Sequence, residues 1–60
     1  MFTFTLKTDN AAFEDDLAWS EIARLLRETA DRVEQQKCDS GVLRDSNGNR
    51  VGVFDYQPLA

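Results

Sequence analysis

The chain of 60 residues carries seven Lys and Arg residues against eleven Asp and Glu residues, for a formal charge of −4. A chain of this length builds one hydrophobic core at most, so we expect a single small domain over residues 1–60. It contains no histidine, and Cys38 is the only cysteine. An internal disulfide is therefore excluded, and a structural zinc site is disfavoured because one thiolate cannot supply four ligands.

The same composition bears on partners and compartment. The acidic balance disfavours direct binding to nucleic acid, which proteins grip with basic side chains. No apolar run approaches the roughly 20 residues that span a bilayer, and the start of the sequence does not resemble a signal peptide. A single thiol is typical of a reducing compartment. We expect a cytoplasmic protein without membrane contact.

The first predicted element is a strand over residues 2–7, where apolar side chains alternate strictly with threonines and a lysine. This period of two is typical of a half-buried strand. Turn-forming residues follow at residues 8–10. Phe13 stands between polar neighbours in the connector at residues 11–16, and we expect it to enter the core from there.

A helix is predicted over residues 17–36, because apolar residues recur at about 100° per residue and gather on one face. Asp15 or Asp16 is expected to cap the first turn with its carboxylate. Charged residues occupy the opposite face. The predicted apolar face consists of Ala18, Trp19, Ile22, Leu25, Leu26, Thr29, Ala30 and Val33.

The last predicted element is a β-hairpin with strands at residues 42–45 and 50–56, because two apolar runs flank an Asn-Gly dipeptide. Pro58 ends the second strand, and residues 57–60 are expected to form a loose tail. The element order predicts an α+β fold, β-α-β-β, with one amphipathic helix packed on a three-stranded, mainly antiparallel sheet. If the final strand lies in the middle, all neighbouring strands are antiparallel.

Two registers of this hairpin are compatible with its turn. A two-residue loop pairs Leu43 with Gly52. A three-residue loop, with Gly48 in the left-handed conformation, pairs Leu43 with Val51. We favour the three-residue loop because it places Leu43, Val51 and Val53 on one face and gathers more apolar area there.

No pattern in the sequence predicts a catalytic, cofactor or metal site. Cys38 has no histidine to activate it and follows the predicted helix C-terminus, where the dipole disfavours a thiolate. The acidic residues at residues 14–16 do not have the spacing of a calcium loop, and the turn at residues 45–49 lacks the downstream glutamate of an EF-hand. We therefore expect no enzymatic activity and look for protein-binding residues.

Three aromatic residues are candidates for protein contact. Trp19 lies at the edge of the predicted apolar face and is interpreted either as a core residue or as a contact anchor, since Trp is frequent in interface hot spots. Phe54 and Tyr56 have the parity opposite to Val51 and Val53. If the helix covers the valines, both aromatics lie on the bare sheet face, unless Phe54 packs under the C-terminal tail.

The residue pattern at 8–15, 21–27, 30–34, 40–45 and 47–52 resembles short proteins encoded by phages and prophages. This resemblance covers most of the chain and carries no motif with assigned chemistry. Small acidic phage proteins include anti-CRISPR and other anti-defence inhibitors. The resemblance therefore implies an accessory protein that binds a host protein or nucleoprotein complex in the host cytoplasm.

Such an inhibitor is expected to cover a basic surface of its target with negative charge. The predicted negative patch consists of Asp9, Glu14, Asp15, Asp16 and Glu21. The alternative is a self-associating structural or assembly module without inhibitory activity, a homodimer for example, in which Trp19, Phe54 and Tyr56 are buried between copies. A further alternative is direct nucleic-acid binding through the arginines at positions 24, 27, 44 and 50.

Overall fold

The predicted α+β fold is confirmed in a computed structural model, which describes residues 1–58. The predicted tail therefore lies partly outside the described residues. The helix has the predicted bounds, and the first hairpin strand begins two residues earlier than expected. In chain order the elements are β1 (Phe2–Leu6), the 3₁₀ turn η1 (Ala11–Phe13), α1 (Leu17–Gln36), β2 (Ser40–Arg44) and β3 (Arg50–Tyr56).

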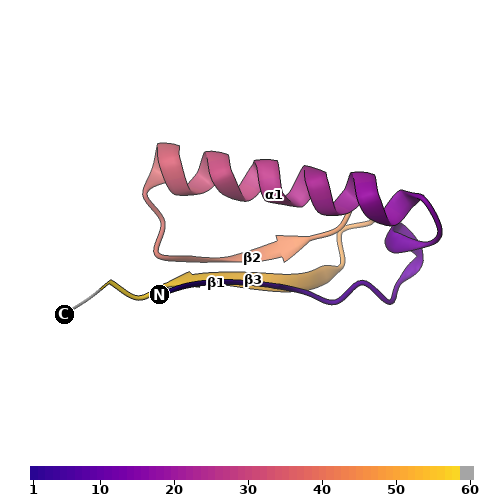
Figure 1. The fold of residues 1–60 in the computed structure, drawn as a ribbon, viewed down its shortest axis with the longest axis horizontal. Coiled ribbons are helices and arrows are strands. Elements are labelled where there is room, and N and C mark those ends of the chain that lie inside the picture. Colours follow the sequence, from indigo (N-terminus) through magenta and orange to yellow (C-terminus); the bar gives the residue numbers. More distant parts are fainter. Residues whose placement is uncertain (59–60) are drawn as a thin grey trace.

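The three strands form one antiparallel sheet in the order β1-β3-β2. The last strand is thus the central one, which makes every neighbour antiparallel, as expected. Phe4 of β1 lies opposite Phe54 of β3, and Val42 of β2 lies opposite Val53. Figure 1 shows α1 running along one face of this sheet while the other face stays bare.

The hairpin closes through the predicted three-residue loop. The backbone N–H of Asp45 donates to the carbonyl of Asn49 at 2.9 Å, and Arg44 lies opposite Arg50. Gly48 has a φ of +85°, in the left-handed region that glycine adopts without steric cost. The loop length and the left-handed Gly48 that the sequence predicts are both present.

A bulge beyond this loop changes the pairing. Leu43 lies opposite Gly52, not opposite Val51, because β3 contributes one extra residue between these positions. Leu43 and Val51 are both buried, whereas Val53 is 39% exposed. The prediction that Leu43, Val51 and Val53 share one face is wrong, since one extra residue reverses the side on which every following side chain lies.

The same bulge turns Phe54 into the core, where it is 1% exposed. Of the two interpretations left open for Phe54, the one that places it on the bare face is therefore wrong. Phe13 is buried as well and enters the core from the connector, as predicted. Together with Ala12, Leu25, Leu43 and Val51, these two aromatics form the hydrophobic core.

Both ends of α1 lie next to left-handed residues. Asp16, at the N-cap, makes no side-chain capping hydrogen bond, so the predicted carboxylate cap is wrong at this residue. Its backbone is already right-handed helical, whereas a capping residue is usually extended. The N–H of Leu17 donates instead to the carbonyl of Glu14 at 3.0 Å. Asp15 (φ +50°) and Lys37 (φ +52°) are the left-handed residues.

Candidate functional site

The main exposed apolar surface lies on the side of α1 that borders β1. Trp19 is 74% exposed, Leu26 48% and Phe2 of β1 47%. Ala30 and Val33 are exposed on the same side of α1. We call these five residues the apolar strip.

The apolar strip is uncovered because the apolar face of α1 does not coincide with its buried face. The helix buries Glu21, Leu25 and Thr29 most deeply. At about 100° per residue, the centre of the apolar residues is rotated by roughly 60° from this buried line, towards β1. The sequence places Trp19 and Leu26 on the predicted core face, but the sheet leaves both side chains exposed.

A groove lies at the foot of the apolar strip. It has a volume of about 330 Å³ and is bordered by β1 and α1. Thr29 belongs to its lining and is 4% exposed, yet its hydroxyl has no hydrogen-bond partner among residues 1–58. The other lining residues are apolar: Phe2, Phe4, Leu26, Ala30 and Val33.

The opposite side of α1 is charged and engaged with the edge strand β2. Arg32 donates from Nη1 to the carbonyl of Val42 at 2.9 Å, and Arg24 donates from Nη2 to the carbonyl of Arg44 at 3.2 Å. The Arg32 guanidinium also lies 5.1 Å from the ring centre of Phe54, within the range of a cation–π contact. Two arginines thus occupy the outer edge of β2.

By contrast, the outer edge of β1 is not engaged. The backbones of Met1 and Lys7 hydrogen-bond to Gln57 and Val51, so the odd-numbered residues of this strand face β3. Because residues alternate along a strand, the backbone N–H and C=O groups of the even-numbered residues point outward. Within residues 1–58, no side chain donates to or accepts from those outward groups. An unpaired edge of this kind is a template for pairing with another strand.

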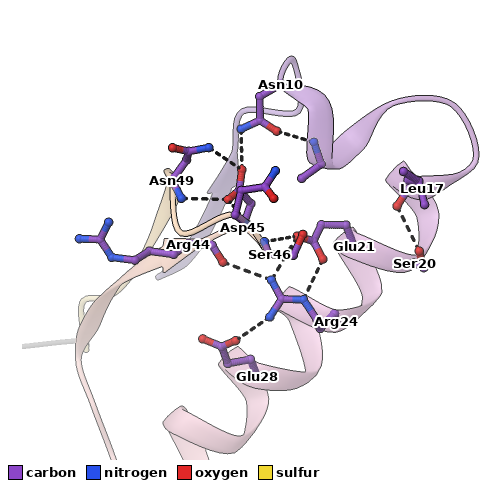
Figure 2. A network of polar contacts seen from close by, with 12 residues as sticks. Asn10, Leu17, Ser20, Glu21, Arg24, Glu28, Arg44, Asp45, Ser46 and Asn49 are labelled. Carbon is purple, nitrogen blue, oxygen red and sulfur yellow. Dashed lines mark hydrogen bonds and ion pairs between the residues drawn. The ribbon is translucent and has the colours of Figure 1, made fainter.

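A polar network joins the start of α1 to the hairpin turn (Figure 2). Arg24 donates from Nε to Oε1 of Glu21 at 2.7 Å and reaches Oε2 of Glu28 at 3.2 Å. The backbone N–H of Ser46 donates to Oε2 of Glu21 at 2.7 Å. The hydrogen bond from Arg24 lowers the pKa of Glu21 and outweighs the opposing effect of burial.

Asp45 organises the turn on the other side of this network. Its carboxylate accepts the backbone N–H groups of Asn47 and Asn49, each at 2.9 Å, and the side-chain amide of Asn10 at 2.8 Å (Figure 2). Burial raises the pKa of Asp45, but the backbone and side-chain donors together outweigh it and hold the pKa below its ordinary value. The turn residues thus have a structural role.

The predicted negative patch is only partly assembled. Glu14, Asp15 and Asp16 are exposed together at the corner before α1, and we call them the acidic corner. Asp9 is exposed in the preceding loop. Glu21 is 7% exposed and bound by Arg24, so its charge does not face a partner.

The predicted aromatic residues do not form one surface. Phe54 lies in the core under α1, and Trp19 lies in the apolar strip. Tyr56 is exposed, but it lies opposite Phe2 and so has the parity of the helix-covered face. The bare sheet face carries instead Val42 (38% exposed) and Val53 (39% exposed) among threonines.

Sequence reasoning missed Phe2, Leu26 and Val33 as surface residues, because their periodicity is that of core positions. The sequence did contain one signal that some apolar residues of α1 stay exposed, namely the length of the predicted helix relative to the predicted strands. A sheet of three short strands cannot cover every apolar residue on α1. Which of them remain exposed depends on the rotation of the helix, which is fixed by tertiary contacts.

Within residues 1–58, no group of three or more cysteine, aspartate and glutamate side chains has a geometry that holds a metal ion. Cys38 is partly buried, with Sγ 3.5 Å from Oε1 of Gln36. No helix in the described part is long and apolar enough to cross a membrane.

Fold and surface together define a small α+β domain, with one helix on three strands and an unpartnered apolar strip beside an open strand edge. Comparisons of the chain with models of protein families, with curated proteins and with solved structures find no match.

Proposed function

We propose that this chain acts by binding another protein through the apolar strip. The observation that carries the proposal is the exposure of Phe2, Trp19 and Leu26 on one side of the molecule. A domain of this size needs most of its apolar side chains to build its core. Large exposed apolar patches in small soluble domains therefore usually mark interaction sites. Trp in particular contributes strongly to contact energy.

The partner that we propose is a protein or nucleoprotein complex of a host cell, which makes the chain an accessory inhibitor of the anti-CRISPR or anti-defence kind. The resemblance to short phage proteins and the net charge of −4 support this proposal. The acidic corner, three residues before Trp19 in the chain, provides negative charge near an aromatic anchor. That combination favours a target with a basic rim around an apolar pocket.

Affinity capture from host lysate, followed by mass spectrometry, tests this proposal. Leu26→Glu places a charge in the apolar strip, and Leu17→Glu is its matched control, because Leu17 is 59% exposed on the other side of α1. We expect the original chain and Leu17→Glu to retain a defence or nucleic-acid-processing complex that Leu26→Glu loses. Recovery of the same proteins by all three forms contradicts a role for the strip.

A specific observation favours self-association as a second candidate function. The residues that α1 contributes to the apolar strip recur with the spacing of a helix–helix contact. This candidate corresponds to a structural or assembly module, and it makes a prediction about the partner that can be tested with the purified chain alone.

A further inference from the structure

The exposed side of α1 has the spacing of a coiled-coil seam. Trp19, Ala23, Leu26, Ala30 and Val33 follow one another at intervals of four, three, four and three residues. This repeat keeps one side of a helix turned towards a partner helix over several turns. Large and small side chains alternate along it, so that alanines leave room for the large side chains of a facing helix. We call these five residues the seam.

The seam is nearly symmetric about Leu26: Trp19 and Val33 each lie seven residues from it, while Ala23 lies three residues and Ala30 four residues away. If a second α1 lies antiparallel to the first with the two Leu26 side chains in register, Trp19 of each copy comes opposite Val33 of the other. Ala23 then comes close to Ala30 of the other copy. A surface that matches itself after a two-fold rotation is the requirement for a closed homodimer.

The groove beside the seam provides a place for the aromatic ring. Its walls at Phe2, Leu26 and Val33 are apolar, and the antiparallel arrangement brings Trp19 of the second copy to the end of the groove at Val33. A buried indole N–H needs an acceptor. Thr29 belongs to the groove lining and its hydroxyl has no partner among residues 1–58, so it becomes such an acceptor if its buried oxygen turns towards the groove.

Charge distribution also favours the antiparallel arrangement. It places the acidic corner of each copy near Lys37 at the C-terminal end of the other α1, and it opposes the two helix dipoles. Aromatic side chains bury on the order of 150–250 Å² each, and a standard interface buries about 800 Å² on each partner. The strip has five residues, fewer than the roughly 20–30 on each side of a standard interface, so the expected association is weak, in the micromolar range.

We propose that the occupant of the apolar strip is a second copy of this chain, with the two α1 helices packed antiparallel about Leu26. This inference rests on the second candidate function, self-association, and it uses the apolar strip as the contact surface. It goes further by naming the partner. A second copy and a host target use the same strip, so the dimer and the host complex are alternative states of the chain that exclude each other.

Sedimentation equilibrium of the purified chain from micromolar to millimolar concentration tests the dimer. We expect a monomer–dimer equilibrium whose dissociation constant rises at least about tenfold in Leu26→Glu, since a buried central residue is lost. Leu17→Glu introduces the same charge on the other side of α1 and is expected to leave the dissociation constant unchanged. Monomeric behaviour of the original chain at all concentrations overturns the inference.

Disulfide trapping tests the direction of the helices. In a Cys38→Ser background, Ala23→Cys and Ala30→Cys are oxidised separately and as a mixture. The antiparallel arrangement predicts disulfide-linked heterodimers in the mixture and few linked pairs in either variant alone. Efficient linkage of Ala23→Cys to itself instead overturns the antiparallel arrangement.

The two proposals fail in different ways. If the chain is monomeric while Leu26→Glu loses an identified host partner that Leu17→Glu retains, the dimer is wrong and the proposed function stands. If the chain is monomeric and neither variant changes any binding, both are wrong.

Discussion

Arg24 holds the carboxylate of Glu21 at two points, with Nε 2.7 Å from Oε1 and Nη2 3.2 Å from Oε2. This pair is the centre of the network that fixes α1 against the hairpin turn, because Glu21 also accepts the backbone N–H of Ser46. The arrangement buries a charged residue that the periodicity of the helix places outside its apolar face. It fixes the side of α1 that lies next to the hairpin turn.

Acid should weaken the fold through Glu21. Its pKa lies below the ordinary value of 4.5, so between the two pKa values the unfolded chain binds more protons than the folded one. The contribution of Glu21 is present above about pH 5 and is lost as the pH falls through the folded-state pKa. Urea unfolding at pH 7 and pH 3 should show a smaller difference for Glu21→Gln than for the original chain.

Asp45 titrates with the same sign, so the pH dependence of Glu21→Gln is expected to be reduced but not abolished. Asp16→Asn is a suitable control, because this exposed carboxylate makes no capping hydrogen bond. An unchanged pH dependence in Glu21→Gln contradicts the role assigned to the pair.

Removing the hydroxyl of Thr29 should stabilise the folded monomer. The hydroxyl is buried and has no partner among residues 1–58, and an unsatisfied buried polar group costs about 1–3 kcal/mol. Thr29→Val keeps the shape of the side chain and should raise the free energy of unfolding by about 1 kcal/mol at concentrations where the chain is monomeric. The exposed Thr5→Val serves as the matched control and should change it by less than about 0.5 kcal/mol.

Replacement by alanine should reduce the stability of the fold to different extents at two glycines. At Gly52 a β-carbon would collide with the backbone carbonyl of Thr5 on the neighbouring strand, and moving a strand is expensive. At Gly48 the space is open, and the cost is that of a left-handed alanine, about 1–2 kcal/mol. We expect a larger loss of stability for Gly52→Ala than for Gly48→Ala in denaturant unfolding; the reverse order would contradict the close approach of β1 and β3.

A glycine should stabilise the end of α1. Lys37 ends the helix with a φ of +52°, a conformation that glycine adopts more easily than any other residue. Lys37→Gly should raise the free energy of unfolding by about 0.5–1 kcal/mol, even after the loss of a favourable charge at the helix C-terminus. Lys37→Ala removes the charge without relieving the backbone, so it should give no gain in the same thermal and urea measurements.

Local signals predicted much of the fold. The bounds of α1 at residues 17–36 follow from the length of the apolar period, and the loop around Gly48 follows from the Asn-Gly turn. Phe13 was placed correctly in the core because an isolated aromatic residue in a polar connector has few other places to go. Each of these depends on residues close together in the chain.

Long-range contacts explain why some predictions about burial were wrong. The burial of Glu21 depends on the Ser46 N–H, 25 residues later, and no helical period reveals this partner. The inward position of Phe54 depends on the bulge near Val51, which a hydrophobic pattern does not announce. Glu21 and Phe54 thus occupy buried positions that the sequence pattern assigns to other residues, and this explains why the strip at Leu26 was not predicted.

The arginines that bind the carbonyls of Val42 and Arg44 have a consequence for polymerisation. A sheet with an unpaired strand at each edge can add strands from other molecules on both sides and grow into a filament. Here Arg24 and Arg32 block the addition of a strand at the edge formed by β2. Strands can then add only at the edge formed by β1, so growth stops once two molecules have joined there. Replacing both arginines would remove this terminator and expose the protein to open-ended fibre formation.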